Sequence, residues 1–276
     1  MSAASIAFIG GGNMARSLIG GLIADGYPTD AIHVADPDPQ AREELKANFG
    51  VHVGSDNHAV AAVADAVVLA VKPQMMRQVA QELGPTVCER NSLVISIAAG
   101  VRVADLTAWL GDERLAVVRT MPNTPALVQT GATALYANAH VSKGQRDLAE
   151  CLLRAAGLTQ WLEDERLMDA VTAISGSGPA YFFLLIEILE RSGEKLGLPA
   201  GTARLLTLQT ALGAAKMALE SAEDAQILRQ RVTSPGGTTE AALRVLEEGG
   251  LRELMEAATR AAATRAQELG KLLGEQ

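Results

Sequence analysis

The stretch "IAFIGGGNMARSLIGGLI", from Ile6 to Ile23, decides the fold of this chain. A short apolar run leads into Gly10-x-Gly12-x-x-Ala15, and helical sequence follows directly. In this order Gly10 permits a tight turn, Gly12 lets the backbone approach a pyrophosphate, and Ala15 lets helix and strand pack closely. The N-terminus of the helix offers free N–H groups to phosphates. The stretch therefore predicts a dinucleotide-binding strand, turn and helix.

Short apolar runs alternate with helical sequence through the first half of the chain. Because nearly every position in them is apolar, they predict strands buried on both faces, as in a parallel, doubly wound sheet. The expected strands are Ile6–Ile9, Ile32–Ala35, Ala66–Val71, Leu93–Ala98 and Leu115–Thr120, with weaker ones at Ala132–Ala137 and Thr159–Glu163. This half is expected to be an α/β, Rossmann-type domain over residues 1–165.

After about Arg166 the apolar residues recur at helical spacing. One helix should begin near Pro179 and end at Gly197, since proline favours a first turn and glycine an end. Further helices are expected at Ala200–Glu220, Thr239–Glu248 and Leu251–Leu272. Residues 166–276 are therefore expected to form an all-helical second domain.

Composition narrows the class of protein. The chain has 276 residues and a net charge of −8, which argues against nucleic-acid binding because that function demands a basic face. Two cysteines, Cys88 and Cys151, supply no disulfide framework and indicate a reducing compartment. No secretory signal precedes the first strand, and no apolar run approaches the roughly 18 residues of a membrane span. We expect a cytoplasmic protein without membrane contact.

Asp36 ends the second expected strand, in "VADPDP". An acid at this place binds ribose hydroxyls and repels a 2′-phosphate, which favours NAD over NADP. The alternative is a local role, an Asx-turn before Pro37. Arg42 can still swing toward a phosphate, so the cofactor preference stays open.

Ligands of such sheets lie beyond the carboxyl ends of the strands. This rule places "AVKPQ" (Ala70–Gln74) and "IAAG" (Ile97–Gly100) beside the cofactor. Lys72 is expected either to contact a phosphate or ribose, or to be solvated like most lysines at strand ends. The four histidines, His33, His52, His58 and His140, lack metal-ligand spacing, so we expect packing or surface roles and no metal.

The whole chain resembles the pyrroline-5-carboxylate reductase family, which makes L-proline in the last step of its biosynthesis. The matching blocks, in the order of the family, are "FIGGGNMA", "LAVKPQ", "ISIAAGV", "RTMPNTPALV", "SGSGPAYFF" and "VTSPGGTTEAALRVLE". The last block is the most diagnostic, because glycine-loop motifs occur in many dehydrogenases. The resemblance implies an enzyme that reduces L-1-pyrroline-5-carboxylate by hydride transfer from NADPH or NADH.

The resemblance also implies a helical domain that binds substrate and interlocks with its partner in a homodimer, often assembled into a decamer. By matched position, the cofactor contacts would come from Ile9, Gly10, Gly11, Gly12, Asn13, Met14, Asp36, Asn57, Ala70, Val71, Lys72, Pro73, Ile97, Ala98 and Ala99. The family more often has a small polar residue where Asp36 stands, and many members prefer NADPH.

The loop Ser-Pro-Gly-Gly-Thr-Thr, residues 234–239, opens an expected helix and so exposes unpaired N–H groups to an anion. The implied substrate carries one carboxylate, which we expect against these N–H groups. A second start of this kind lies in "SGSGPA", residues 175–180. The expected substrate-binding residues are Ser177, Ser234, Gly236, Gly237, Thr238 and Thr239.

Thr239 is the expected catalytic residue, since the resemblance assigns its position a hydrogen bond to the ring nitrogen. A hydroxyl suits both the iminium and the product amine, because it can accept and donate. The alternative is a simple N-cap with a glycine-rich elbow, in which Glu240 satisfies the helix dipole. No histidine, cysteine or carboxylate stands in an obvious acid role, so catalysis would depend mainly on positioning.

Three other functions come into question for this sequence. A β-hydroxyacid dehydrogenase needs a catalytic lysine on the long helix after its glycine-rich loop, but here no lysine follows "SGSGPA" until Lys195. A regulatory nucleotide sensor without turnover would not need the threonine-bearing loop. Reduction of a related cyclic imine remains an alternative.

Overall fold

The computed structural model describes residues 3–275, which divide into two compact units. The first unit runs to Ser177 and also includes the C-terminal residues from Ala262, and the second unit is Gly178–Ala261. The chain therefore leaves the first unit once and returns to it in its last helix. The sequence-based domain boundary at residue 165 stays a prediction.

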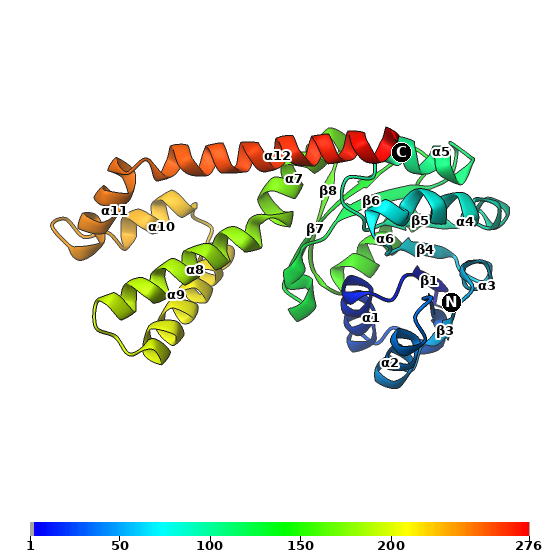
Figure 1. Cartoon of the computed structure of the whole chain (residues 1–276), viewed down its shortest axis with the longest axis horizontal. Helices are drawn as coiled ribbons and strands as arrows, with labels where there is room; N and C mark the ends of the chain where they lie inside the picture. The colour runs from blue at the N-terminus through cyan, green and yellow to red at the C-terminus, as the bar shows by residue number, and fades with distance from the viewer. Residues whose placement is uncertain (1–2, 276) are drawn as a thin grey trace. The chain divides into compact units, whose positions relative to one another are not determined.

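The first unit is built on one sheet, whose strand order within residues 3–275 is β3-β2-β1-β4-β5-β6-β7-β8 (Figure 1). Neighbouring strands are parallel except β6 and β7, which are antiparallel. The strands are β1 Ile6–Ile9, β2 Ile32–Ala35, β3 His52–Gly54, β4 Ala66–Leu69, β5 Leu93–Ser96, β6 Val117–Met121, β7 Gly131–Ala137 and β8 Gly157–Leu162. The order 3-2-1-4-5-6 is that of a Rossmann sheet, so the predicted fold class is confirmed.

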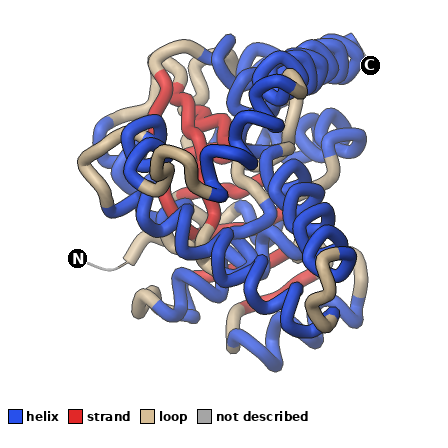
Figure 2. The backbone as a smooth tube through the Cα atoms, turned by 90° about the vertical axis from the view of Figure 1, so that its left-hand side faces the viewer, coloured by secondary structure: helices blue, strands red, loops and turns tan. Residues whose placement is uncertain are grey.

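Helices cover both faces of this sheet (Figure 2). Each face has its own apolar core. One core joins the strands to α1, α2 and α6, and the other joins them to α3, α4 and α5. The helices are α1 Asn13–Ala24, α2 Pro39–Phe49, α3 Asn57–Ala61, α4 Met76–Arg90, α5 Val103–Leu110 and α6 Lys143–Arg154. A parallel sheet buried in this way accounts for the near-continuous apolar strands.

The predicted strands differ from the structure at several ends. The strand β4 ends at Leu69 rather than Val71, β5 ends at Ser96 rather than Ala98, and β8 covers Gly157–Leu162 rather than Thr159–Glu163. The strand β3 was not predicted, because it has three residues and none of them is buried. The strand β6 begins at Val117 rather than Leu115, although Leu115 is buried. Burial of a residue beside a strand thus imitates the strand pattern.

The segment from Glu165 to Gly176 leads out of the sheet. It consists of the 3-10 turn η4 (Glu165–Leu167), the short helix α7 (Met168–Val171) and the π-helical turn η5 (Thr172–Gly176). The long helix α8 (Gly178–Lys195) follows. π-helical turns are frequent at functional sites.

The second unit is helical, as predicted. It contains α8, α9 (Ala200–Glu220), α10 (Ala225–Arg231), α11 (Thr238–Glu248) and the first part of α12 (Leu251–Glu275). The predicted bounds of α9 are confirmed, whereas α10 was not predicted. Large apolar side chains on α8 and α9 are exposed in the single chain, among them Phe182, Phe183, Leu205 and Leu212. Apolar patches of this kind mark interaction surfaces.

One expectation about hydropathy needs correction. The helical segment Glu165–Lys195 is long and apolar enough to cross a membrane by length and composition, whereas no such run was expected. The difference arises because its few charged residues cluster toward its ends and leave an apolar window between them. A single helix of this kind, searched for in residues 3–275, is weak evidence for a membrane span.

Candidate functional site

The glycine-rich turn between β1 and α1 has the geometry that its sequence predicts. Gly10 has φ of +100°, and a Cβ there would lie 2.8 Å from the carbonyl oxygen of Ala70. Only glycine fits this position without strain. A Cβ on Gly12 would meet nothing within 4 Å, so the space beside that backbone is open. Ala15 is buried against the sheet.

The N-terminus of α1 is available to an anion. Its N-cap is Gly12, no side chain caps it, and its first turn carries no acidic residue. Unpaired N–H groups and the positive end of the helix dipole therefore face the same open space. These features fit a pyrophosphate.

Asp36 connects the end of β2 to the glycine-rich turn. Its Oδ2 accepts a hydrogen bond of 2.7 Å from the Gly11 N–H, and its Oδ1 accepts one of 2.9 Å from the Asp38 N–H. The second bond is the Asx-turn of the alternative interpretation. Because each carboxylate oxygen has a further lone pair, the turn does not prevent a ribose contact, which stays a prediction.

Arg42 lies beside the same strand end. Its Nη1 donates to the carbonyl oxygens of Asp36, at 2.6 Å, and of Pro37, at 2.9 Å. A guanidinium is thus held next to the carboxylate that would repel a 2′-phosphate. The two side chains would have opposite effects on the affinity for a 2′-phosphate bound there.

The other predicted cofactor residues follow the carboxyl ends of neighbouring strands. Ala70–Pro73 come after β4, and Ile97–Ala99 come after β5. The register brings these ends together, since Leu69 pairs with Ile9 on one side and Ser96 on the other. Asn57 begins α3, directly after β3, and its Nδ2 lies 3.4 Å from Glu82 Oε1. Lys72 is exposed.

The loop after β6, "MPNTPA", is tied to the π-helical turn η5. Asn123 Nδ2 donates to the Ser175 carbonyl oxygen at 3.2 Å, and Asn123 Oδ1 accepts from the Ala132 N–H at 2.9 Å. A Cβ on Gly176 would lie 2.5 Å from the end of the Met121 side chain. The predicted residue Ser177 closes the turn by donating its N–H to the Thr172 carbonyl oxygen at 2.8 Å. The role of Asn123 in tying this loop to η5 has no signal in the sequence, because Ser175 lies 52 residues away.

The glycine–threonine loop of the second unit is partly occupied by its own groups. The Gly236 N–H donates to Glu240 Oε2 at 2.7 Å, and the Gly237 N–H donates to the Ser234 carbonyl oxygen at 3.0 Å. The N-cap of α11 is Gly237, without a side-chain cap. The alternative interpretation expected a threonine N-cap, which is not formed. It also expected Glu240 to act at the start of the helix, and the bond from the Gly236 N–H to the Glu240 carboxylate agrees with that.

The first backbone N–H groups of α11 remain open. Thr238 and Thr239 begin the helix, and neither donates its N–H to another group in residues 3–275. The Thr239 side chain is half-buried, and Thr238 is exposed. An anion at this loop would bind these two N–H groups directly and would compete with Glu240 for that of Gly236.

The histidines behave as packing or surface residues. The rings of His33 and His52 stack on neighbouring strands, with centroids 4.9 Å apart. Burial, and then the neighbouring His52, lower the pKa of His33 below its usual 6.5. No group of three or more His, Cys, Asp or Glu able to hold a metal occurs among residues 3–275.

Known proteins match both units of the chain. A family model for pyrroline-5-carboxylate reductase dimerisation matches residues 165–269, and one for NADP oxidoreductase, coenzyme F420-dependent, matches residues 5–100. A pyrroline-5-carboxylate reductase of Pseudomonas aeruginosa is 53% identical over 275 residues, which cover 100% of both chains. The chain belongs to the pyrroline-5-carboxylate reductase family.

More distant relatives and solved structures agree. A pyrroline-5-carboxylate reductase of Arabidopsis thaliana is 38% identical over 96% of this chain and 95% of its own. The structure of a pyrroline-5-carboxylate reductase from Coxiella burnetii matches with a TM-score of 0.93 at 50% identity, over 96% of this chain and 98% of that chain. The Plasmodium falciparum pyrroline carboxylate reductase with NADP bound matches with a TM-score of 0.85 at 30% identity, over 98% and 99%.

Proposed function

We propose that this chain reduces L-1-pyrroline-5-carboxylate to L-proline with a hydride from NADPH or NADH, the last step of proline biosynthesis. The observation that carries the proposal is the 53% identity to a pyrroline-5-carboxylate reductase over the whole of both chains. The open glycine-rich turn and the uncapped start of α1 support it, because they fit a dinucleotide.

The first unit would hold the cofactor along the carboxyl ends of its strands. The N-terminus of α1 and the backbone of Gly12 would bind the pyrophosphate, and Asp36 would bind the adenosine ribose. Residues Ala70–Pro73 and Ile97–Ala99 would line the path toward the nicotinamide. When bound, the cofactor supplies the hydride; the residues of the chain supply the position of the ring.

The second unit would hold the substrate at the start of α11. The carboxylate would accept hydrogen bonds from the open N–H groups of Thr238 and Thr239, with Ser234 nearby in the same loop. The Thr239 hydroxyl would bond to the ring nitrogen, as accepting partner of the iminium and as partner of the product amine. Ser177 of the first unit is a further proposed substrate residue.

Catalysis would come mainly from orientation. A protonated C=N group is already a strong electrophile, so a hydride can add to its carbon without a further acid. Holding the two rings face to face and excluding water would be the contribution of the protein. This agrees with the loop at the start of α11, which offers hydroxyl groups and backbone N–H groups besides the Glu240 carboxylate.

The helical unit would form an interlocked homodimer, with assembly to a decamer in the cytoplasm. The exposed apolar side chains of α8 and α9 support a partner subunit, since a single chain leaves them in water. The match of residues 165–269 to a dimerisation family model supports the same proposal.

Steady-state oxidation of NADPH and NADH, run in parallel with racemic pyrroline-5-carboxylate, tests the function. We expect turnover with at least one cofactor and formation of L-proline. Cofactor binding without turnover would overturn the proposal in favour of a sensor. Faster turnover of a different cyclic imine than of pyrroline-5-carboxylate would overturn the substrate assignment.

A further inference from the structure

A polar cavity of about 390 Å³ lies in the first unit, beside the ends of β5 and β6. It is lined by charged side chains from three places in the sequence and by two glycines. The lining residues are Gly100, Arg102, Arg119, Glu165, Arg166, Asp169, Gln267 and Gly270. Gly100, the last residue of the stretch Ile97–Gly100 expected beside the cofactor, belongs to this lining, but none of the individually proposed cofactor- or substrate-binding residues does. The function proposed above therefore does not account for the charged side chains of the cavity.

Arg119 is a buried side chain in the lining of this cavity. Its side chain is only 7% exposed, which is uncommon for arginine. Nη1 donates to Glu165 Oε1 at 2.8 Å, and the same oxygen accepts from the Val103 N–H at 2.9 Å. Within the described residues, Nε and Nη2 of Arg119 donate no hydrogen bond. A buried guanidinium therefore offers its remaining donors to the cavity that it lines.

The charges around the cavity do not all cancel. Arg119 is paired with Glu165, and Arg166 is paired with Asp164 at 2.7 Å. Arg102 and Asp169, in contrast, form no ion pair with each other or with another group in residues 3–275, although both are half-buried and line the same space. One positive and one negative side chain are thus left unmatched in one cavity.

Two glycines keep this space accessible next to Arg102. A Cβ on Gly270, in α12, would lie 3.1 Å from the Gly100 carbonyl oxygen and 3.8 Å from Arg102 Nε. The guanidinium of Arg102 is therefore held close to the backbone of α12. The backbone at Gly100 has φ of +81°, which a side chain rarely tolerates.

We propose that this cavity binds a small zwitterion of the amino-acid class. Its carboxylate would accept hydrogen bonds from Arg102 and from the free donors of Arg119, because a guanidinium matches a carboxylate in shape and charge. Its ammonium group would pair with Asp169. A simple anion would leave Asp169 unmatched, and a simple cation would leave Arg102 unmatched.

The test measures binding of L-alanine, as a small neutral zwitterion, to the full chain by saturation-transfer NMR and calorimetry at constant ionic strength. Acetate is the second probe, because it carries the carboxylate without the ammonium. We expect L-alanine to bind more tightly than acetate. Arg102→Gln and Asp169→Asn should each weaken L-alanine binding by about tenfold or more, since each removes a charged partner.

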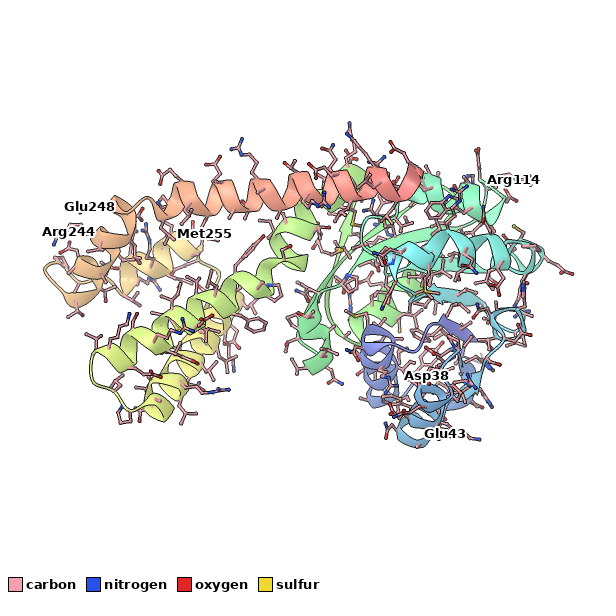
Figure 3. All side chains as sticks on the ribbon, viewed as in Figure 1. Asp38, Glu43, Arg114, Arg244, Glu248 and Met255 are labelled. Atoms are coloured by element: carbon pink, nitrogen blue, oxygen red, sulfur yellow. The ribbon has the colours of Figure 1, made fainter. Side chains whose placement is uncertain are left out.

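Arg114→Gln is the matched control, because Arg114 is an exposed arginine of the same unit outside the cavity lining (Figure 3). It should leave the affinity for L-alanine unchanged. Because the side chains of Arg102 and Asp169 form no ion pair within residues 3–275, their variants should keep the wild-type thermal melt. An equal loss of L-alanine affinity in all three variants would overturn the proposal. Equal affinities for acetate and L-alanine, unchanged by Asp169→Asn, would overturn it as well. Displacement of L-alanine by NADPH would also overturn it, because the ligand would then occupy the dinucleotide site.

Discussion

The Asn123 side chain joins the loop after β6 to Ser175, 52 residues later, through a hydrogen bond of 3.2 Å to the Ser175 carbonyl oxygen. Its other end holds Ala132, at the start of β7. One amide therefore fixes three segments at the place where the chain turns into α8. Ser177 lies two residues beyond the tie, so its position depends on this amide.

Replacing Asn123 by alanine should lower the free energy of unfolding by about 1–3 kcal/mol, because it leaves partly buried backbone groups without partners. We also expect a higher KM for pyrroline-5-carboxylate, since Ser177 would lose its anchor. Thr124→Ala is the control, because Thr124 is exposed in the same loop. A lower Tm with an unchanged KM would show that the tie is structural only.

Thr239→Ala should reduce kcat/KM by about tenfold to a hundredfold, as expected for one lost hydrogen bond to the reacting ring. Thr238→Ala removes the neighbouring hydroxyl but keeps the backbone N–H that would bind the carboxylate. It should therefore stay near the wild-type kcat/KM. Equal losses in the two variants would contradict a specific role for the Thr239 hydroxyl; cofactor affinity should be unchanged in both.

Glu240 occupies the Gly236 N–H, at 2.7 Å, that the substrate carboxylate is expected to approach. Glu240→Ala should lower KM for the substrate, because it frees this donor and removes a like charge. Glu248→Ala makes the same charge change at the other end of α11 (Figure 3) and should leave KM unchanged. A higher KM in Glu240→Ala would mean that the Glu240 carboxylate supports the conformation of the loop rather than competing with the substrate.

Asp36→Ser should shift cofactor preference toward NADPH, since it removes the negative charge beside the expected 2′-phosphate and leaves Arg42 in place. We expect the ratio of kcat/KM values for NADPH and NADH to rise by about tenfold. Arg42→Ala in the Asp36→Ser background should reverse the gain. If the ratio is unchanged in Asp36→Ser, Asp36 has only a structural role, through its hydrogen bonds to the N–H groups of Gly11 and Asp38.

The stability of the first unit should fall as the pH decreases below the ordinary His33 pKa of 6.5. Burial and the stacked His52 lower the pKa of His33 in the folded chain, so the unfolded chain binds more protons in this range. The contribution of neutral His33 to the free energy of unfolding is complete above pH 6.5. It is lost as the pH falls through the lowered pKa of His33 in the folded chain. Melting curves of His33→Gln should show a weaker decrease than wild type, whereas the exposed-site variant His140→Gln should match wild type.

Local patterns predicted much of the fold. The bounds of β1, β2 and α9 agree with the structure, because apolar runs and helical spacing report burial directly. The three-residue strand β3 and the polar helix α10 were missed, since neither has a pattern of its own. The roles of the site residues came from the resemblance to the family, and they stay predictions.

The sequence by itself determined the Rossmann order of elements, the glycine-rich turn and the helical second unit, because each depends on neighbouring residues and their period. Only the tertiary structure decided which distant groups meet: Asp36 with Gly11, Asn123 with Ser175, and Arg119 with Glu165. Such contacts bring together residues 25 to 52 positions apart, and their partners are set by strand register and chain path rather than by local pattern.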